Sequence, residues 1–119
     1  MALAAGQGDR HSLGITYHQI GLVHQEQKQY VPALEWYQKA VEAKEVALAA
    51  GQGEEYSLSL TFYAMSLVYE ATNDIADAIR YMEKSVEALQ RINHLDLQQR
   101  RARLENLKKR TTGWMRRGS

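Results

Sequence analysis

The sequence predicts an all-α fold in which two helical hairpins and a C-terminal capping helix stack as an α-α superhelix, or solenoid. Three observations predict it. A stretch of 45 residues occurs twice along the chain. Apolar residues inside each copy recur at steps of three and four, which is the helical period. The chain is also rich in residues that favour helices and contains a single proline.

Composition limits the class of protein before any element is assigned. With 119 residues, 45% of them hydrophobic, the chain suits one domain with a single core. It has no cysteine, which removes disulfides, thiolate nucleophiles and cysteine-based zinc sites. No stretch approaches the ~18 consecutive apolar residues of a membrane span, and the apolar start at residues 1–5 is too short for a signal peptide. We therefore expect a cytoplasmic protein.

The repeat is the firmest feature of the sequence. Residues 2–8, Ala-Leu-Ala-Ala-Gly-Gln-Gly, recur as residues 47–53. Continuing the same alignment through the whole unit without a gap gives 17 identities in 45 positions. A match of that length without gaps is hard to obtain by chance, so the chain is organised as a repeat.

Two 45-residue units are expected within residues 1–93, at about 9–50 and 54–93. Residues 1–8 resemble the tail of a missing preceding helix, because their second copy ends one. Two units are fewer than the ~3 that usually make a stable solenoid. We therefore expect that the uncapped N-terminal end can associate with a second copy to form a homodimer.

The first unit is predicted to hold two helices joined by a polar turn at residues 25–29. Pro32 falls in the first turn of the second helix, where its missing N–H costs least. This helix is expected to run to about Ala50 and to end at Gly51, because glycine accepts the left-handed cap conformation. The apolar stripes of the two helices are Leu13, Tyr17, Ile20 and His24, then Ala33, Tyr37, Ala40 and Val41.

The second unit follows the same plan, with Asn73 and Asp74 as its turn and helix cap. Its stripes are Leu58, Phe62, Met65 and Tyr69, then Ile79, Met82, Val86 and Leu89. A capping helix is expected within residues 94–112, from about Leu97 to Arg110, with Asp96 as its cap. Residues 113–119 are expected to be a flexible tail.

The spacing of large and small residues in both units resembles the tetratricopeptide repeat family. The pattern of that family has, at fixed spacings, an aromatic residue, Leu-Gly and Tyr on the first helix, then Ala, an aromatic residue and a second Ala on the following helix. The matching positions are Tyr17, Ile20-Gly21, His24, Ala33, Tyr37 and Ala40, then Phe62, Met65-Ser66, Tyr69, Ala78, Met82 and Ser85. The resemblance covers about residues 10–93. Each unit is longer than the usual repeat of about 34 residues. In this length the units are similar to the repeats of kinesin light chain, the Leu-Gly-Asn adaptors and bacterial members of the family.

The resemblance implies a non-catalytic module that binds a peptide or a partner helix in a concave groove lined by the first helix of each unit. The positions that would line it are Ile15, His18, Leu22, Gln25, Leu60, Tyr63, Leu67 and Glu70. Leu22 and Leu67 stand where the adaptors carry a peptide-holding Asn, and the carboxylate clamp of chaperone-binding members is absent. So apolar a lining suits an amphipathic helix or a hydrophobic peptide. The alternative is that these leucines only pack neighbouring first helices together.

The basic C-terminal segment supports a rival function. Residues 1–99 have a net charge of −6 and residues 100–119 a net charge of +7. These cations could bind nucleic acid, another anionic polymer or an acidic membrane surface. The candidates are Arg100, Arg101, Arg103, Lys108, Lys109 and Arg110, with Trp114, Arg116 and Arg117 nearby. The alternative is a solvated face on a capping helix whose leucines cover the end of the stack.

No pattern in the sequence predicts an enzyme, a metal site or a cofactor. His18 and His24 are six residues apart, a spacing that places them on different helix faces. The two Gly-Gln-Gly segments follow helices and lack the Lys-Ser/Thr of a nucleotide site. We therefore expect a protein or peptide partner, and treat nucleic acid or membrane as the less favoured class.

Overall fold

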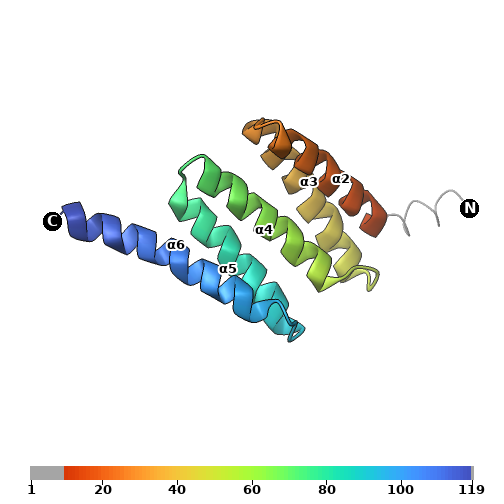
Figure 1. Ribbon diagram of the computed structural model, residues 1–119. Helices are drawn as coiled ribbons and strands as arrows, with labels where there is room; N and C mark the ends of the chain where they lie inside the picture. Colours follow the sequence, from red (N-terminus) through yellow and green to blue (C-terminus); the bar gives the residue numbers. More distant parts are fainter. Residues whose placement is uncertain (1–9, 119) are drawn as a thin grey trace, which may run out of the picture.

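A computed structural model of the chain describes the backbone of residues 10–118 and the side chains of residues 10–111. These residues form five helices and no strand, as expected for an all-α solenoid (Figure 1). Their bounds are α2 Arg10–Glu26, α3 Tyr30–Ala49, α4 Glu55–Ala71, α5 Ile75–Arg91 and α6 Leu97–Gly118. Residues 1–8, expected to be the tail of a preceding helix, lie outside the described range.

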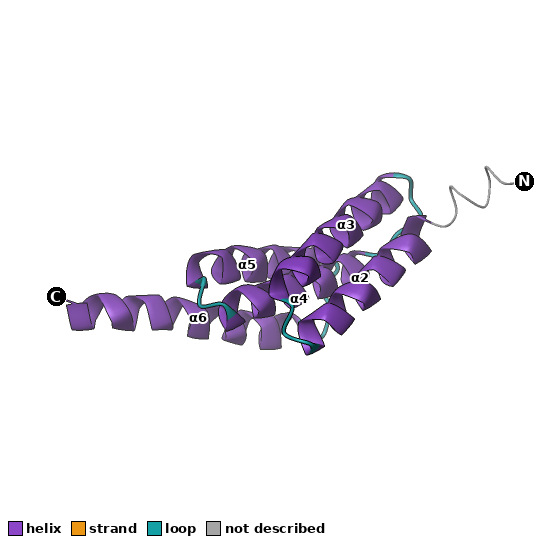
Figure 2. Cartoon of the chain, turned by 90° about the horizontal axis from the view of Figure 1, so that it is seen from above, coloured by secondary structure: helices purple, strands orange, loops and turns teal. Residues whose placement is uncertain are grey.

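The helices form two hairpins, α2 with α3 and α4 with α5, and α6 lies against the second hairpin (Figures 1 and 2). The first hairpin stacks on the second mainly through α3 and α4, and more weakly through α2 and α4. Because each layer contacts only its neighbours in the sequence, the N-terminal and C-terminal ends lie at opposite ends of the stack (Figure 1).

The helix boundaries follow from local backbone chemistry. Pro32 lies in the first turn of α3, where the helix needs no N–H from it. Gly51 follows α3 with a φ of 74°, the left-handed conformation that glycine adopts without strain. Asp74 caps α5 by accepting a hydrogen bond from the backbone N–H of Asp77 at 3.2 Å. These three predicted boundaries are confirmed to within a residue.

The core lies between the two hairpins. Tyr37 of α3 is fully buried and Phe62 of α4 is 6% exposed, and both belong to one hydrophobic cluster. The other members of that cluster are Ala33, Val41, Leu58, Ala64, Met65 and Val68. This is the arrangement that the duplicated stripes predict, because each stripe is covered only by the next layer.

Small residues let the two helices of each hairpin approach closely. A Cβ added to Gly21 would lie 2.6 Å from the ring of Tyr37, so the bare glycine backbone is what makes room for that ring. In the second hairpin the equivalent residue is Ser66, whose hydroxyl donates to the backbone carbonyl of Ala78 at 2.6 Å. The repeat therefore conserves a close approach with two different side chains.

A second cluster joins α5 to α6 and completes the C-terminal end of the stack. Leu97, Leu104 and Leu107 of α6 are buried against apolar residues of α5. The helix does not end near Arg110, however, but continues through residues 113–118, where we expected a tail. One glycine in the interior of a helix costs only about 1 kcal/mol, and no proline follows, so Gly113 does not stop it.

The N-terminal end of the stack is open by comparison. Leu13 and Val23 of α2 are 41% and 52% exposed. Their equivalents in the second unit, Leu58 and Val68, are 4% and 0% exposed because the first hairpin covers them. The same side chains therefore meet a neighbour in one unit and solvent in the other.

Replacing Gly21 with Ala is expected to destabilise the protein even though alanine favours helices. The added methyl meets the buried Tyr37 ring, and overpacking of this kind costs about 1–3 kcal/mol, more than the ~1 kcal/mol gained in helix propensity. Urea unfolding measures the change. The matched control is Gln19→Ala on an exposed position of the same helix, expected to be neutral or slightly stabilising. Equal stability of Gly21→Ala and the wild type would contradict the close approach.

Candidate functional site

The eight side chains predicted to line a groove divide into two sets of four. His18, Gln25, Tyr63 and Glu70 contact other side chains of the protein. The other four are aliphatic, and we call them the apolar strip. They are Ile15 and Leu22 on α2 and the equivalent Leu60 and Leu67 on α4. Each residue of the strip lies three positions before a residue of the other set. A step of three residues rotates the side-chain direction about the helix axis by about 60°, so the two sets lie on neighbouring faces of their helices.

His18 and Gln25 join α2 to its neighbours. The Nδ1 atom of His18 lies 2.9 Å from the hydroxyl of Thr61 on α4, and its ring lies 5.2 Å from that of Tyr37. The Tyr37 hydroxyl donates to Oε1 of Gln25 at 2.6 Å. Burial, reinforced by the negative charge of Glu26, raises the pKa of Tyr37 well above its ordinary value. These side chains stabilise the first hairpin and its joint to the second.

A buried lysine completes this joint, and no local pattern in the sequence predicts it. Lys44 of α3 is 3% exposed, and its ammonium donates to the Thr61 hydroxyl at 2.8 Å and to the Ser57 carbonyl at 2.9 Å. Burial lowers the pKa of Lys44 to about 8. Burial and the positive charge of Lys44 together lower the pKa of His18 to about 4. At neutral pH the joint therefore holds a neutral imidazole beside an ammonium whose two hydrogen-bond acceptors, on Thr61 and Ser57, are uncharged.

Tyr63 and Glu70, the equivalents of His18 and Gln25 in the second unit, contact side chains of α6. The guanidinium of Arg100 lies over the Tyr63 ring, 4.0 Å from its centroid. The Glu70 carboxylate accepts from Arg103 at 3.1 Å and from Arg110 at 2.7 Å. Two predicted groove residues are thus contacts of the capping helix.

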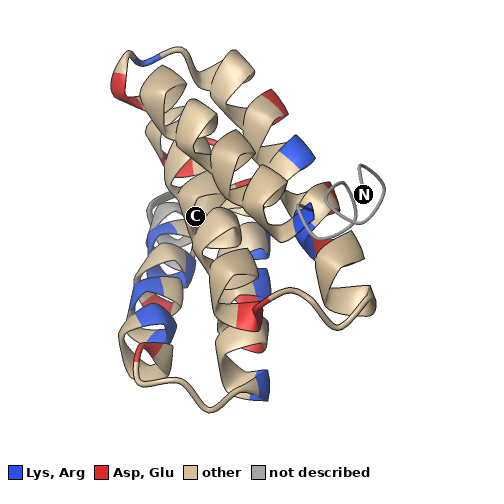
Figure 3. Ribbon diagram, turned by 90° about the vertical axis from the view of Figure 1, so that its right-hand side faces the viewer, with Lys and Arg blue, Asp and Glu red and all other residues tan. Residues whose placement is uncertain are grey.

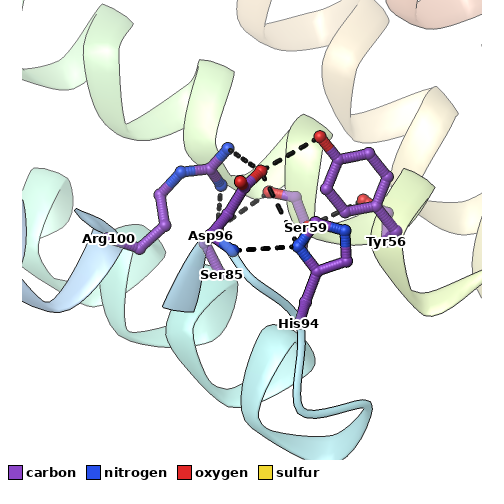
Figure 4. A network of polar contacts seen from close by, with 6 residues as sticks. All are labelled: Tyr56, Ser59, Ser85, His94, Asp96 and Arg100. Carbon is purple, nitrogen blue, oxygen red and sulfur yellow. Dashed lines mark hydrogen bonds and ion pairs between the residues drawn. The ribbon is translucent and has the colours of Figure 1, made fainter. Parts of the chain in front are cut away.

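A polar network fixes the start of α6 against the second hairpin (Figure 4). Asp96 accepts a hydrogen bond from the Tyr56 hydroxyl at 3.1 Å, and the Tyr56 ring stacks on His94 with centroids 4.2 Å apart. Arg100 donates a hydrogen bond to the Ser85 hydroxyl at 2.9 Å (Figure 4). The Ser85 hydroxyl in turn donates to the backbone carbonyl of Ser59 at 2.9 Å. Asp96 precedes the helix, as expected of a cap, but its carboxylate is used to bind α4.

The apolar strip is less covered. Ile15 and Leu22 are 38% and 39% exposed, while Leu60 and Leu67 are half-buried. Among the large apolar side chains exposed within residues 10–111, six of eight belong to the first unit. Those six are Leu13, Ile15, Leu22, Val23, Val31 and Val46. The uncovered apolar surface is therefore concentrated towards the N-terminal end of the stack.

Most of the candidate anion-binding cations contact other groups of the protein. Lys and Arg gather on α6 (Figure 3). Arg100 is 7% exposed, Arg103 and Arg110 bind Glu70, and Lys108 lies 3.7 Å from Glu83. Arg101, Lys108, Lys109 and Arg110 are exposed, and of these Lys108 and Arg110 contact the carboxylates just named. The side chains of Trp114, Arg116 and Arg117 lie outside the described range.

Neither metal-binding clusters nor membrane-spanning helices occur in the part of the chain that the structure describes. Within it, no three His, Asp or Glu side chains are grouped so that they could hold a metal ion. No helix among the described residues is long and apolar enough to cross a membrane.

Comparison with known proteins agrees with the repeat. A model of the tetratricopeptide repeat matches residues 14–51, and a second model of the same repeat matches residues 61–88. The two matches fall on the two hairpins and together cover more than half of the chain. No curated protein and no solved structure gives a significant match.

Lys44→Leu is expected to stabilise the protein at pH 7, since the second unit carries the fully buried Leu89 at the equivalent position. In the unfolded chain a lysine titrates near 10.5, so the buried Lys44 lowers stability in full below pH 8, and less and less as the pH rises to 10.5. The free energy of unfolding of the variant should exceed that of the wild type by about 1–3 kcal/mol at pH 7, and the difference should be smaller at pH 10.

Urea unfolding of both proteins at pH 7 and pH 10 measures the gain, and tyrosine ionisation affects both alike. Lys39→Leu, at an exposed position of the same helix, is the control and should show no such pH dependence. A gain for Lys44→Leu that is the same at both pH values would contradict the assigned environment of the ammonium.

Proposed function

Because the chain belongs to the tetratricopeptide repeat family, whose repeats generally mediate protein–protein interactions, we propose that it is a non-catalytic module that binds a peptide or a partner helix along the apolar strip. The strip supplies two pairs of aliphatic side chains, each pair seven residues apart on adjacent helices. Two turns of a helix separate the members of a pair, by about 10.5 Å. Such spacing suits a partner helix that repeats its own apolar residues every seven positions.

The exposure of the strip is the observation that carries the proposal. Where the other four predicted residues are held by Thr61, Tyr37 and the arginines of α6, Leu22 and Ile15 stay more than a third exposed. Ile15 and Leu22 lie two turns apart on one face of α2, and exposed apolar side chains grouped in this way favour a binding site over scattered exposure.

Binding of an anionic polymer or an acidic membrane surface is the less favoured function. Arg100, Arg103 and Arg110 are occupied by Ser85 and Glu70, so an anionic partner would have to compete for them. The two functions respond differently to salt, because binding through several cations weakens steeply as the salt concentration rises.

We also propose that the chain self-associates through its open N-terminal end. The support is the contrast between the exposed Leu13 and Val23 and their buried equivalents Leu58 and Val68. Sedimentation equilibrium should then show a concentration-dependent dimer.

Leu22→Asp is expected to remove the partners that bind the strip, because it places a charge on the strip with little cost to the fold at a site that is 39% exposed. Quantitative affinity capture would compare the proteins retained by the variant and by the wild type. Val46→Asp, 45% exposed on α3, is the matched control and should retain the same partners. If Leu22→Asp retains them too, and moderate salt removes them, the anionic alternative is the correct function.

A further inference from the structure

The uncovered face of α2 has a defined composition. It carries the exposed Leu13, Thr16 and Val23 and the half-buried Ile20, which repeat at helical spacing on one side of the helix. Within the second unit the same side of α4 is buried under the first hairpin, where Thr61 and Val68 are 0% exposed. The chain itself therefore shows that this type of face packs against another helix.

The charges at the two ends of α2 are unusual. Arg10 lies in the first turn and Glu26 in the last, so each charge is at the unfavourable end of its own helix dipole. By contrast, α5 follows the favourable order, with Asp77 in its first turn and Arg91 in its last, and α4 begins with Glu55. The two charges on α2 would instead suit a second helix running in the opposite direction.

An equivalent case already exists inside the protein. Glu70 lies in the last turn of α4, also the unfavourable end. Arg103 and Arg110 of the packed helix α6 compensate its charge at 3.1 and 2.7 Å. An arginine on an adjacent helix is thus how this chain stabilises a carboxylate at the end of a first helix.

The face is also complementary to itself. Leu13 and Val23 each lie five residues from position 18, and Arg10 and Glu26 each lie eight residues from it. In an antiparallel pair centred at that level, Leu13 of one copy meets Val23 of the other, and the Arg10 end of one copy lies beside the Glu26 end of the other. A parallel pair would place like charges together at both ends.

We propose that two copies of the chain dimerise by packing α2 against α2 in antiparallel orientation about a two-fold axis at the level of residue 18. The proposal rests on the self-association proposed above and adds the surface, the orientation and the symmetry. Such an interface is isologous, so each contact occurs twice and the assembly closes at two copies. The exposed side chains of α6 within residues 97–111 are polar apart from Ala102, so this described part of the other end has no equivalent apolar face.

Charge reversal tests the orientation. In a two-fold pair, Arg10→Glu places glutamates together at both ends and Glu26→Arg places arginines together at both ends. Each variant alone should dimerise about tenfold more weakly than the wild type, since exposed charge pairs have modest energies that here act twice. An equimolar mixture of the two variants should recover dimers, because every end then holds opposite charges.

Sedimentation equilibrium at low salt measures these affinities. Arg101→Glu and Glu105→Arg, at exposed positions of α6, are the matched controls and should leave the dimer unchanged alone and mixed. Leu13→Asp, at a site 41% exposed, should abolish the dimer without altering thermal unfolding measured under monomeric conditions.

The outcomes separate the two levels of the proposal. A wild type that is strictly monomeric at high concentration overturns both self-association and this interface. A dimer that ignores Arg10→Glu, Glu26→Arg and Leu13→Asp overturns the interface and leaves self-association through another surface. Weakening by each charge variant with recovery in the mixture supports the antiparallel pair.

Discussion

The structure depends on a single constraint: each helical hairpin has apolar residues on two opposite sides and can bury them only by stacking. Val68, covered by the first hairpin, is 0% exposed, whereas the equivalent Val23 is 52% exposed. The same stripe is thus core in one unit and surface in the other. At the C-terminal end, α6 satisfies the constraint with three buried leucines, and its exposed side chains within residues 97–111 are polar apart from Ala102. Stacking of this kind distributes stability over successive interfaces rather than one central core.

The two interfaces use different polar chemistry at equivalent places. In the first, Lys44 and His18 meet at the hydroxyl of Thr61. In the second, Leu89 takes the place of the lysine, and Arg100 of α6 packs on Tyr63. Buried polar groups require specific partners, and each interface has its own: Lys44 with Thr61 in the first, and Arg100 with Ser85 in the second. The duplicated units are therefore not interchangeable.

The sequence predicted the helices, their order and most of their ends, because these follow from local signals such as the Asp74 cap and the glycine after α3. It predicted the candidate site less well. Ile15 and His18 looked equivalent as positions of one lining, yet they lie on neighbouring faces, and only packing decides which face is covered. The arginines of α6 contribute to the net charge that the sequence shows, while the pairing of Arg103 and Arg110 with Glu70 depends on contacts 33 and 40 residues apart in the chain. The burial of Lys44 could not be predicted, because no neighbouring residue in the sequence distinguishes it from an exposed lysine.

The position of the second hairpin between two neighbours has a consequence for motion. Within one copy, and among residues 10–118, the hairpin of α2 and α3 contacts the rest of the stack only through α4, so it can separate from the stack by breaking that interface alone. The hairpin of α4 and α5 is held on both sides, so its backbone amides exchange with solvent only when both interfaces open or the whole chain unfolds. Amide protons of α4 and α5 should thus be the slowest to exchange, and those of α2 should exchange through an opening that leaves the rest of the molecule folded.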